Sequence, residues 1–110
     1  MSFETEGIRQ LNKNELQQRL QDSKTQVIDV RTVVEYEEGH IPNVPNRPMQ
    51  EVERWSKELS PDASYVFVCR SGGRSQKVAQ FFKHAGFKDI ANFSGGMLGW
   101  DGEIRKGAQP

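Results

Sequence analysis

The chemistry of this chain is predicted to lie in residues 66–75, which read VFVCRSGGRS. The β-branched and aromatic residues at the start are typical of a buried strand, and a helical pattern follows the two glycines. A strand, a glycine-containing loop and a helix N-terminus form a cradle for anions, because backbone N–H groups converge there and the helix dipole adds positive charge. Cys69, the single cysteine of the chain, is the first residue of this cradle.

The charges around Cys69 indicate what its thiol does. Arg70 and Arg74 flank the two glycines, and residues 63–88 contain several Lys and Arg but no Asp or Glu. A free thiol has a pKa of about 8.5, which cations and a helix N-terminus lower. The alternative is a small apolar side chain that ends a buried strand. The pattern favours a nucleophilic thiolate that meets an anionic substrate, because a structural thiol needs neither glycines nor arginines.

Composition limits the remaining possibilities. The chain has 110 residues, the size of one domain, with 15 basic and 15 acidic residues, so no global field favours nucleic acid or a membrane surface. No apolar stretch approaches the length of a membrane span, and the acidic N-terminus is unlike a signal peptide. A single cysteine fits a reducing compartment, and we expect a cytoplasmic protein. Two histidines and one cysteine, far apart in the sequence, predict neither a metal site nor a cofactor.

Strand and helix patterns alternate along the chain. Strands are predicted at residues 7–10 (a short edge strand), 26–30, 65–68 and 89–93, with at most a short extended segment among the prolines of 43–48. Helices are predicted at residues 13–22, 32–38, 49–59, 75–84 and after 94–96. This order predicts one α/β domain with a mainly parallel central sheet of about five strands and helices on both faces. The core is expected at residues 7–101, and the polar tail, 102–110, is expected to fray.

Local signals define several element boundaries. Asn12 and Thr32 are predicted N-caps, and Ser75 is the predicted N-cap of the helix that follows the Cys69 loop. Gly95 and Gly96 permit a close approach of two backbone segments. Trp100 is predicted to pack on the domain rather than to contact substrate.

A second candidate for ligand binding is Arg31, which follows the strand at 26–30. Ligands of parallel sheets bind beyond the carboxyl ends of the strands, where both Arg31 and Cys69 are expected. Asp29, on the same strand, is more readily explained as a structural ion-pair partner. His40 is either a general base or, as is commoner for a His after Gly in a turn, bonded to the backbone.

Four segments, in order, resemble the single-domain rhodanese family. They read VIDVR at 27–31, EYEEGHIP at 35–42, CRSGGRS at 69–75 and GGMLGW at 95–100. The chain departs from the family pattern at Asn43-Val44, where Gly-Ala is usual, and at Arg47, where an apolar residue is common. These departures concern the connection after 42 and the choice of acceptor rather than the chemistry of Cys69.

The resemblance implies a sulfurtransferase of the thiosulfate type. Cys69 matches the family's nucleophile, which carries sulfur as a persulfide, and the matching loop implies substrate binding by Arg70, Ser71, Gly72, Gly73, Arg74 and Ser75. The implied partners are a small anionic sulfur donor and an acceptor, which is cyanide, a thiol or a protein. No metal or other cofactor is implied.

Two other functions remain open from the sequence. Cysteine-dependent phosphatases and related arsenate reductases also use a thiolate in an anion loop, but their loops read C-x₅-R, whereas Cys69 and Arg74 are spaced as C-x₄-R. The shorter loop favours sulfur over a tetrahedral phosphoryl group. The second alternative is a binding module that relays sulfur through a protein partner; Cys69 and both arginines argue against a module without chemistry.

Overall fold

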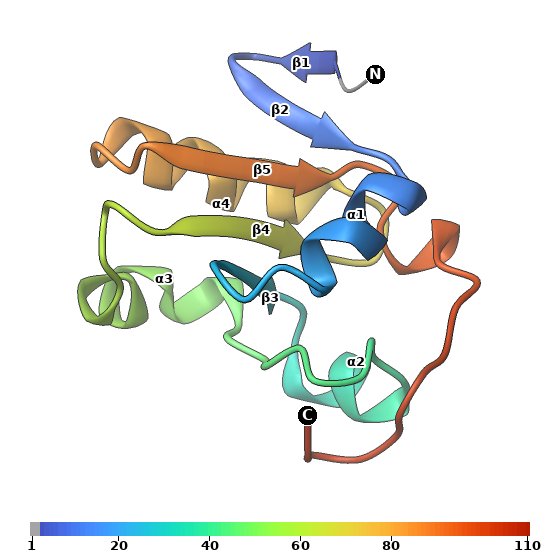
Figure 1. Cartoon of the computed structure of the whole chain (residues 1–110). Coiled ribbons are helices and arrows are strands. Elements are labelled where there is room, and N and C mark those ends of the chain that lie inside the picture. The colour runs from blue at the N-terminus through green and yellow to red at the C-terminus, as the bar shows by residue number, and fades with distance from the viewer. Residues whose placement is uncertain (1–2) are drawn as a thin grey trace.

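The strands of the central sheet are short runs rich in β-branched and aromatic residues. The computed structural model describes residues 3–110 and contains five strands. They are β1 (Phe3–Thr5), β2 (Ile8–Leu11), β3 (Thr25–Asp29), β4 (Ser64–Val68) and β5 (Asp89–Phe93). Their order in the sheet is β1-β2-β5-β4-β3, and all neighbours are parallel except β1 and β2 (Figure 1).

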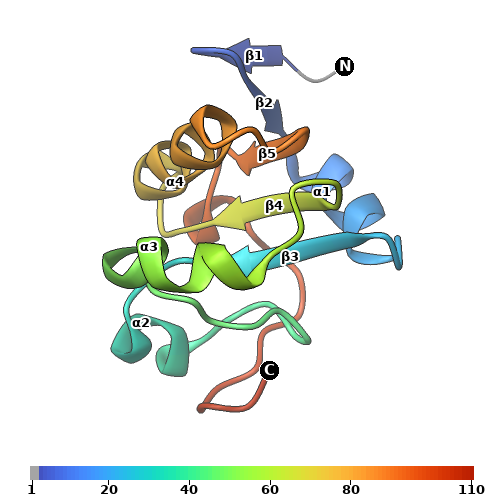
Figure 2. The ribbon, with the colours of Figure 1, turned by 90° about the vertical axis from the view of Figure 1, so that its left-hand side faces the viewer.

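Helices cover both faces of this sheet. They are α1 (Lys13–Leu20), α2 (Val33–Glu38), α3 (Val52–Trp55) and α4 (Gly73–His84). Three 3₁₀ turns accompany them: η1 (Met49–Glu51), η2 (Ser56–Glu58) and η3 (Met97–Gly99). Figure 2 shows α4 on one side of the strands and α1 on the other. The predicted fold class, one α/β domain with a mostly parallel five-stranded sheet and helices on both faces, is therefore confirmed.

Alternation along β4 divides the core into two halves. Tyr65 and Phe67 point to the face that α3 and α4 cover, where they pack with Trp55 and Phe82. Val66 and Val68 point to the other face and pack with residues that include Leu16 of α1. Because successive side chains of a strand alternate, Cys69 belongs to the α4 face, and it is only 1% exposed. The strand thus delivers the thiol to the beginning of α4.

The N-caps of the first two helices were predicted correctly. Asn12 accepts a hydrogen bond from the backbone N–H of Glu15, and Thr32 accepts one from that of Glu35. In both cases the glutamate side chain accepts a bond from the capping residue's N–H, which completes a capping box.

One sheet prediction was wrong, and another is confirmed. The strand predicted at 7–10 is not an edge strand, because β1 pairs antiparallel with β2 and forms the edge instead. The prediction of at most a short extended segment at 43–48 is confirmed, because this segment forms only an isolated bridge between Asn46 and Asp29. The prolines explain this result, since each lacks the N–H that a ladder requires.

The prediction that the tail frays was also wrong. Arg105 and His40 exchange two backbone hydrogen bonds of 3.0 and 2.8 Å, and the Gly107 N–H donates to the Glu37 carbonyl. The Asn43 N–H donates to the carbonyl of Pro110. Polar side chains indicated exposure but carried no information about these main-chain bonds, which attach the tail beside α2 (Figure 1). Within residues 3–110, no helix combines the length and apolar character needed to cross a bilayer.

Candidate active site

The sulfur of Cys69 lies where β4 ends and α4 begins. Its Sγ accepts a hydrogen bond from the Gly72 backbone N–H at 3.1 Å and another from the Ser75 hydroxyl at 3.2 Å. Burial acts to raise the pKa of this thiol, but the hydroxyl and the backbone N–H groups of Ser75, Ser71 and Gly72 outweigh it. The pKa of Cys69 is therefore lowered from its ordinary value. A shift in this direction favours the thiolate form of Cys69.

The helix after the loop begins earlier than predicted. Its N-cap is Gly72, and α4 starts at Gly73, so Ser75 lies inside the first turn and is not the cap. Gly72 has a φ of 96°, a left-handed conformation that glycine adopts without strain. The Ser75 hydroxyl donates to sulfur instead of capping the helix. Only residues 70–72 separate Cys69 from the helix, which brings the first turn of α4 close to the sulfur.

Arg74 is held by an acidic residue from another element. Its guanidinium donates two hydrogen bonds to the Glu35 carboxylate of α2, at 2.7 and 2.8 Å. These bonds are the main cause that lowers the pKa of Glu35 to about 2, and bonds from Thr32 add to the effect. Arg74 therefore ties the first turn of α4 to the first turn of α2.

Glu35 is a residue of the site that the sequence reasoning missed. Thr32 was predicted as an N-cap, but the capping box that it forms with Glu35 was not predicted. Nothing in the sequence spacing connects Glu35 with Arg74, 39 residues later. One sequence signal could have indicated this pair. Residues 63–88 contain no Asp or Glu, so a half-buried arginine in this segment can pair only with a carboxylate from elsewhere in the chain.

The other loop residues are more open to solvent. Arg70, Ser71 and Gly73 are exposed, whereas Gly72 and Ser75 are buried. Arg70 forms no salt bridge within residues 3–110. Its guanidinium is therefore available to an anion, in contrast to that of Arg74.

The turn η3 is hydrogen-bonded to the backbone of the Cys69 loop. The Met97 N–H donates to the Cys69 carbonyl at 2.9 Å, and the Leu98 N–H donates to the Arg70 carbonyl at 3.0 Å. A Cβ at Gly96 would overlap the Arg70 carbonyl, so glycine is required for this approach. The close approach predicted for Gly95-Gly96 therefore occurs at Gly96.

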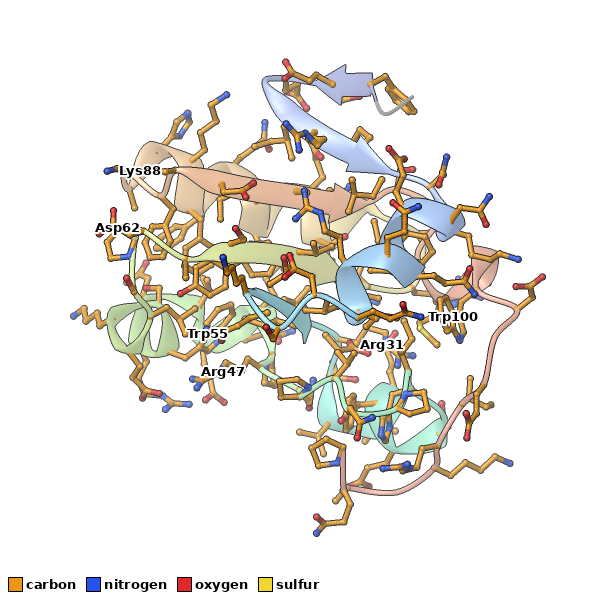
Figure 3. All side chains as sticks on the ribbon, viewed as in Figure 1. Arg31, Arg47, Trp55, Asp62, Lys88 and Trp100 are labelled. Atoms are coloured by element: carbon orange, nitrogen blue, oxygen red, sulfur yellow. The ribbon has the colours of Figure 1, made fainter. Side chains whose placement is uncertain are left out.

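Within residues 3–110, no hydrogen bond or ion pair joins Arg31 to the Cys69 loop. Its guanidinium forms an ion pair of 2.9 Å with Asp29 and donates to the Gly39 carbonyl at 2.8 Å, and Arg31 is 6% exposed (Figure 3). These contacts give both residues a structural explanation. His40 is fully buried, with one ring nitrogen 2.9 Å from the Tyr36 carbonyl oxygen and the other 2.9 Å from that of Gln109. It thus contacts the backbone, as the commoner alternative predicted.

Arg47, one of the departures from the family pattern, has its own partners. Its guanidinium lies 5.9 Å from the ring centroid of Trp55 and forms a 2.9 Å ion pair with Glu58 (Figure 3). Asn43 has a φ of 69°, so it adopts the left-handed conformation that asparagine tolerates. The turn that follows residue 42 is accommodated with these residues in place.

Comparison with known proteins agrees with this geometry. The family model for the rhodanese-like domain matches residues 12–103. The putative sulfurtransferase YtwF of Bacillus subtilis (strain 168) is 35% identical over 99 residues, which are 89% of this chain and 95% of that protein. The putative sulfur carrier protein YrkF of the same strain is 39% identical over 82 residues, 74% of this chain but only 44% of the relative.

A solved structure extends the likeness to the whole fold. The crystal structure of a rhodanese-like domain protein from Staphylococcus aureus superposes with a TM-score of 0.79 at 33% identity, over 88% of this chain and 96% of that one. The sequence resemblance, the fold and the family match therefore agree, and the chain belongs to the rhodanese-like domain family.

Proposed function

We propose that this protein is a sulfurtransferase that moves the outer sulfur of thiosulfate, or of a related donor, to cyanide or a thiol through a persulfide on Cys69. The observation that carries the proposal is the set of donors on Cys69 Sγ, the Gly72 N–H at 3.1 Å and the Ser75 hydroxyl at 3.2 Å. Relatives named as sulfurtransferases support the same reaction class.

In the first step, the Cys69 thiolate attacks the outer sulfur of thiosulfate. The S–S bond of thiosulfate breaks, its electron pair leaves with sulfite, and a new S–S bond forms on Cys69. The lowered pKa of the thiol supports this step, because the thiolate is the reactive form. The exposed guanidinium of Arg70 is proposed to bind the anionic donor and the departing sulfite.

In the intermediate, the terminal sulfur of the persulfide carries the negative charge. The N–H groups of Gly73 and Arg74 belong to the first turn of α4 and have no acceptor within the helix. We propose that they and Ser71 surround this sulfur. The acceptor then attacks the terminal sulfur, the new S–S bond breaks, and the Cys69 thiolate is regenerated. With cyanide the product is thiocyanate, and with a thiolate it is the persulfide of the acceptor.

A protein thiol is included among the proposed acceptors. Val33 and Val34 at the start of α2 and Leu98 of η3 are all more than half exposed. The Leu98 N–H donates to the Arg70 carbonyl, so this apolar residue lies beside the loop. Exposed apolar side chains can contact a protein acceptor, whereas they contribute nothing to the binding of a small anionic donor. The single free thiol of the chain also fits a reducing compartment, and we propose a cytoplasmic location.

The test is a side-by-side assay of two reactions. Purified protein is incubated with thiosulfate and cyanide, with thiocyanate as the readout, and separately with p-nitrophenyl phosphate. We expect thiocyanate from the wild type, none from Cys69→Ser, and negligible phosphate release. Phosphate release without thiocyanate would replace the proposal with the phosphatase alternative.

A further inference from the structure

A cluster of three carboxamides, two of them buried and one half-buried, lies beneath the Cys69 loop. Gln10 of β2 and Asn92 of β5 are only 4% and 2% exposed, and Gln76 of α4 covers them. The Gln10 Nε2 donates to Gln76 Oε1 at 2.7 Å and to the Ile8 carbonyl at 3.0 Å. These amides connect the middle of the sheet to the second turn of α4.

Asn92 links this cluster to the active-site loop. Its Nδ2 lies 2.9 Å from Gln10 Oε1, 3.2 Å from Gln76 Oε1 and 3.2 Å from the carbonyl oxygen of Gly72. Two hydrogens are shared among three acceptors, but Gln76 Oε1 already accepts the shorter bond from Gln10. The two Nδ2 hydrogens of Asn92 are therefore sufficient for one hydrogen bond to Gln10 Oε1 and one to the Gly72 carbonyl.

The other end of the Asn92 side chain is unsatisfied. Its Oδ1 is a buried side-chain oxygen that has no hydrogen-bond partner in the described part of the chain. An unpaired buried carbonyl lowers stability, so this carboxamide is a poor choice if stability is its only purpose. Within residues 3–110, the Asn92 side chain forms hydrogen bonds only through its Nδ2 donor, and one of the acceptors is the carbonyl of Gly72, the residue that precedes α4.

The bond to Gly72 affects the groups that face the sulfur. Gly72 donates its own N–H to Cys69 Sγ at 3.1 Å, and its carbonyl belongs to the next peptide, which carries the N–H of Gly73. In a trans peptide the N–H points away from the carbonyl oxygen. The same oxygen also accepts the first helical bond of α4, from the Gln76 N–H at 3.1 Å. Asn92 and the helix therefore hold the carbonyl together, and the Gly73 N–H is directed the opposite way, at the open end of α4.

We infer that Asn92 is a positioning residue, which acts through the Gly72 carbonyl to hold the backbone N–H groups of the loop on the Cys69 sulfur. A second contact defines the same position: a Cβ at Gly72 would overlap the Ser94 carbonyl, so the loop rests directly on the end of β5. The inference extends the proposed function, since those N–H groups are the ones that would hold the thiolate and the persulfide.

The readout that separates positioning from stability is the pH dependence of Cys69 alkylation by iodoacetamide, which requires no sulfur substrate.

The test variant is Asn92→Ala. If it does not fold, Asn92→Thr replaces it, because a β-branched side chain suits a central strand. The matched control is Gln10→Ala, which removes an amide from the same cluster but leaves the bond between Asn92 and Gly72. Arg70, Arg74 and Glu35, the charged residues around the loop, are unchanged in every variant.

We expect the alkylation midpoint to move to higher pH in the Asn92 variants and to stay at the wild-type value in Gln10→Ala. The thiosulfate kcat/KM of the Asn92 variants should fall roughly tenfold, less than the effect of removing a donor that touches the reacting atoms. An unchanged midpoint in the Asn92 variants would overturn the inference, and so would equal shifts in Gln10→Ala. If the wild type forms no persulfide, the proposed function fails, but the comparison of midpoints still decides the role of Asn92.

Discussion

Arg74 and Glu35 join the two helices that begin at the carboxyl edge of the sheet. The two hydrogen bonds between them, 2.7 and 2.8 Å long, cross from the first turn of α4 to the first turn of α2. Glu35 also completes the capping box of Thr32. One carboxylate therefore caps α2 and fixes the arginine that follows the Cys69 loop.

Replacing Glu35 with Gln should lower stability in a pH-dependent way. The pKa of Glu35 is about 2 in the folded protein and near its ordinary value of 4.5 in the unfolded chain. Its contribution is therefore fully present above about pH 4.5 and is lost as the pH falls towards 2. Urea unfolding of both proteins at about pH 7 and about pH 3 measures this difference. A gap between wild type and Glu35→Gln that is as large at the lower pH would contradict the assignment.

Arg70→Ala should weaken the use of thiosulfate without loss of thermal stability. Arg70 is exposed and forms no salt bridge within residues 3–110, so no folded contact of its charge is lost. A charge-assisted hydrogen bond contributes about 1.5–3 kcal/mol, which corresponds to a rise in KM of roughly ten- to hundredfold. Arg74→Ala, the matched variant, should lower both stability and activity because it breaks the pair with Glu35. Equal losses of melting temperature would refute this division of roles.

Ser75→Ala should raise the pKa of Cys69. The hydrogen bond from the Ser75 hydroxyl is the largest of the effects that lower the pKa of Cys69 against burial, so its removal favours the neutral thiol. The midpoint of alkylation by iodoacetamide should move to higher pH, with the helix itself intact because the N-cap is Gly72. Ser71→Ala is the control, since the Ser71 side chain is exposed and its backbone N–H is retained. A shift in the control but not in Ser75→Ala would be inconsistent with the geometry.

The two tryptophans should differ in their effect on stability. Trp55 is 1% exposed, packs against Phe67 and Phe82, and donates to the Pro48 carbonyl at 2.9 Å. Trp55→Ala should cost about 3–5 kcal/mol, the usual range for a buried tryptophan. Trp100 is only half-buried, against the second half of the core, so Trp100→Ala should cost less. Denaturant titration gives both values, and selective loss of activity in a stable Trp100→Ala would place that side chain in the site.

Much of this architecture could be predicted from the sequence because the decisive signals are local. Apolar runs and capping residues define most strands and helices, and the residues after Cys69 define the anion loop. Contacts between distant segments were not predictable. The pairing of β1 with β2, the Glu35–Arg74 pair and the attachment of the tail to His40 each join segments whose sequences contain no sign of the partner. The start of α4 was misplaced because Ser75 has the residue type of a cap while its hydroxyl is bound to sulfur.

The most direct test of the central claim is the intact mass of the protein after incubation with thiosulfate and removal of excess reagent. The account predicts that one sulfur atom is added to the wild type, that cyanide removes it with formation of thiocyanate, and that Cys69→Ser gains no mass. A wild-type mass that does not change, or a sulfur atom gained by Cys69→Ser, would contradict the assignment of Cys69 as the sulfur carrier.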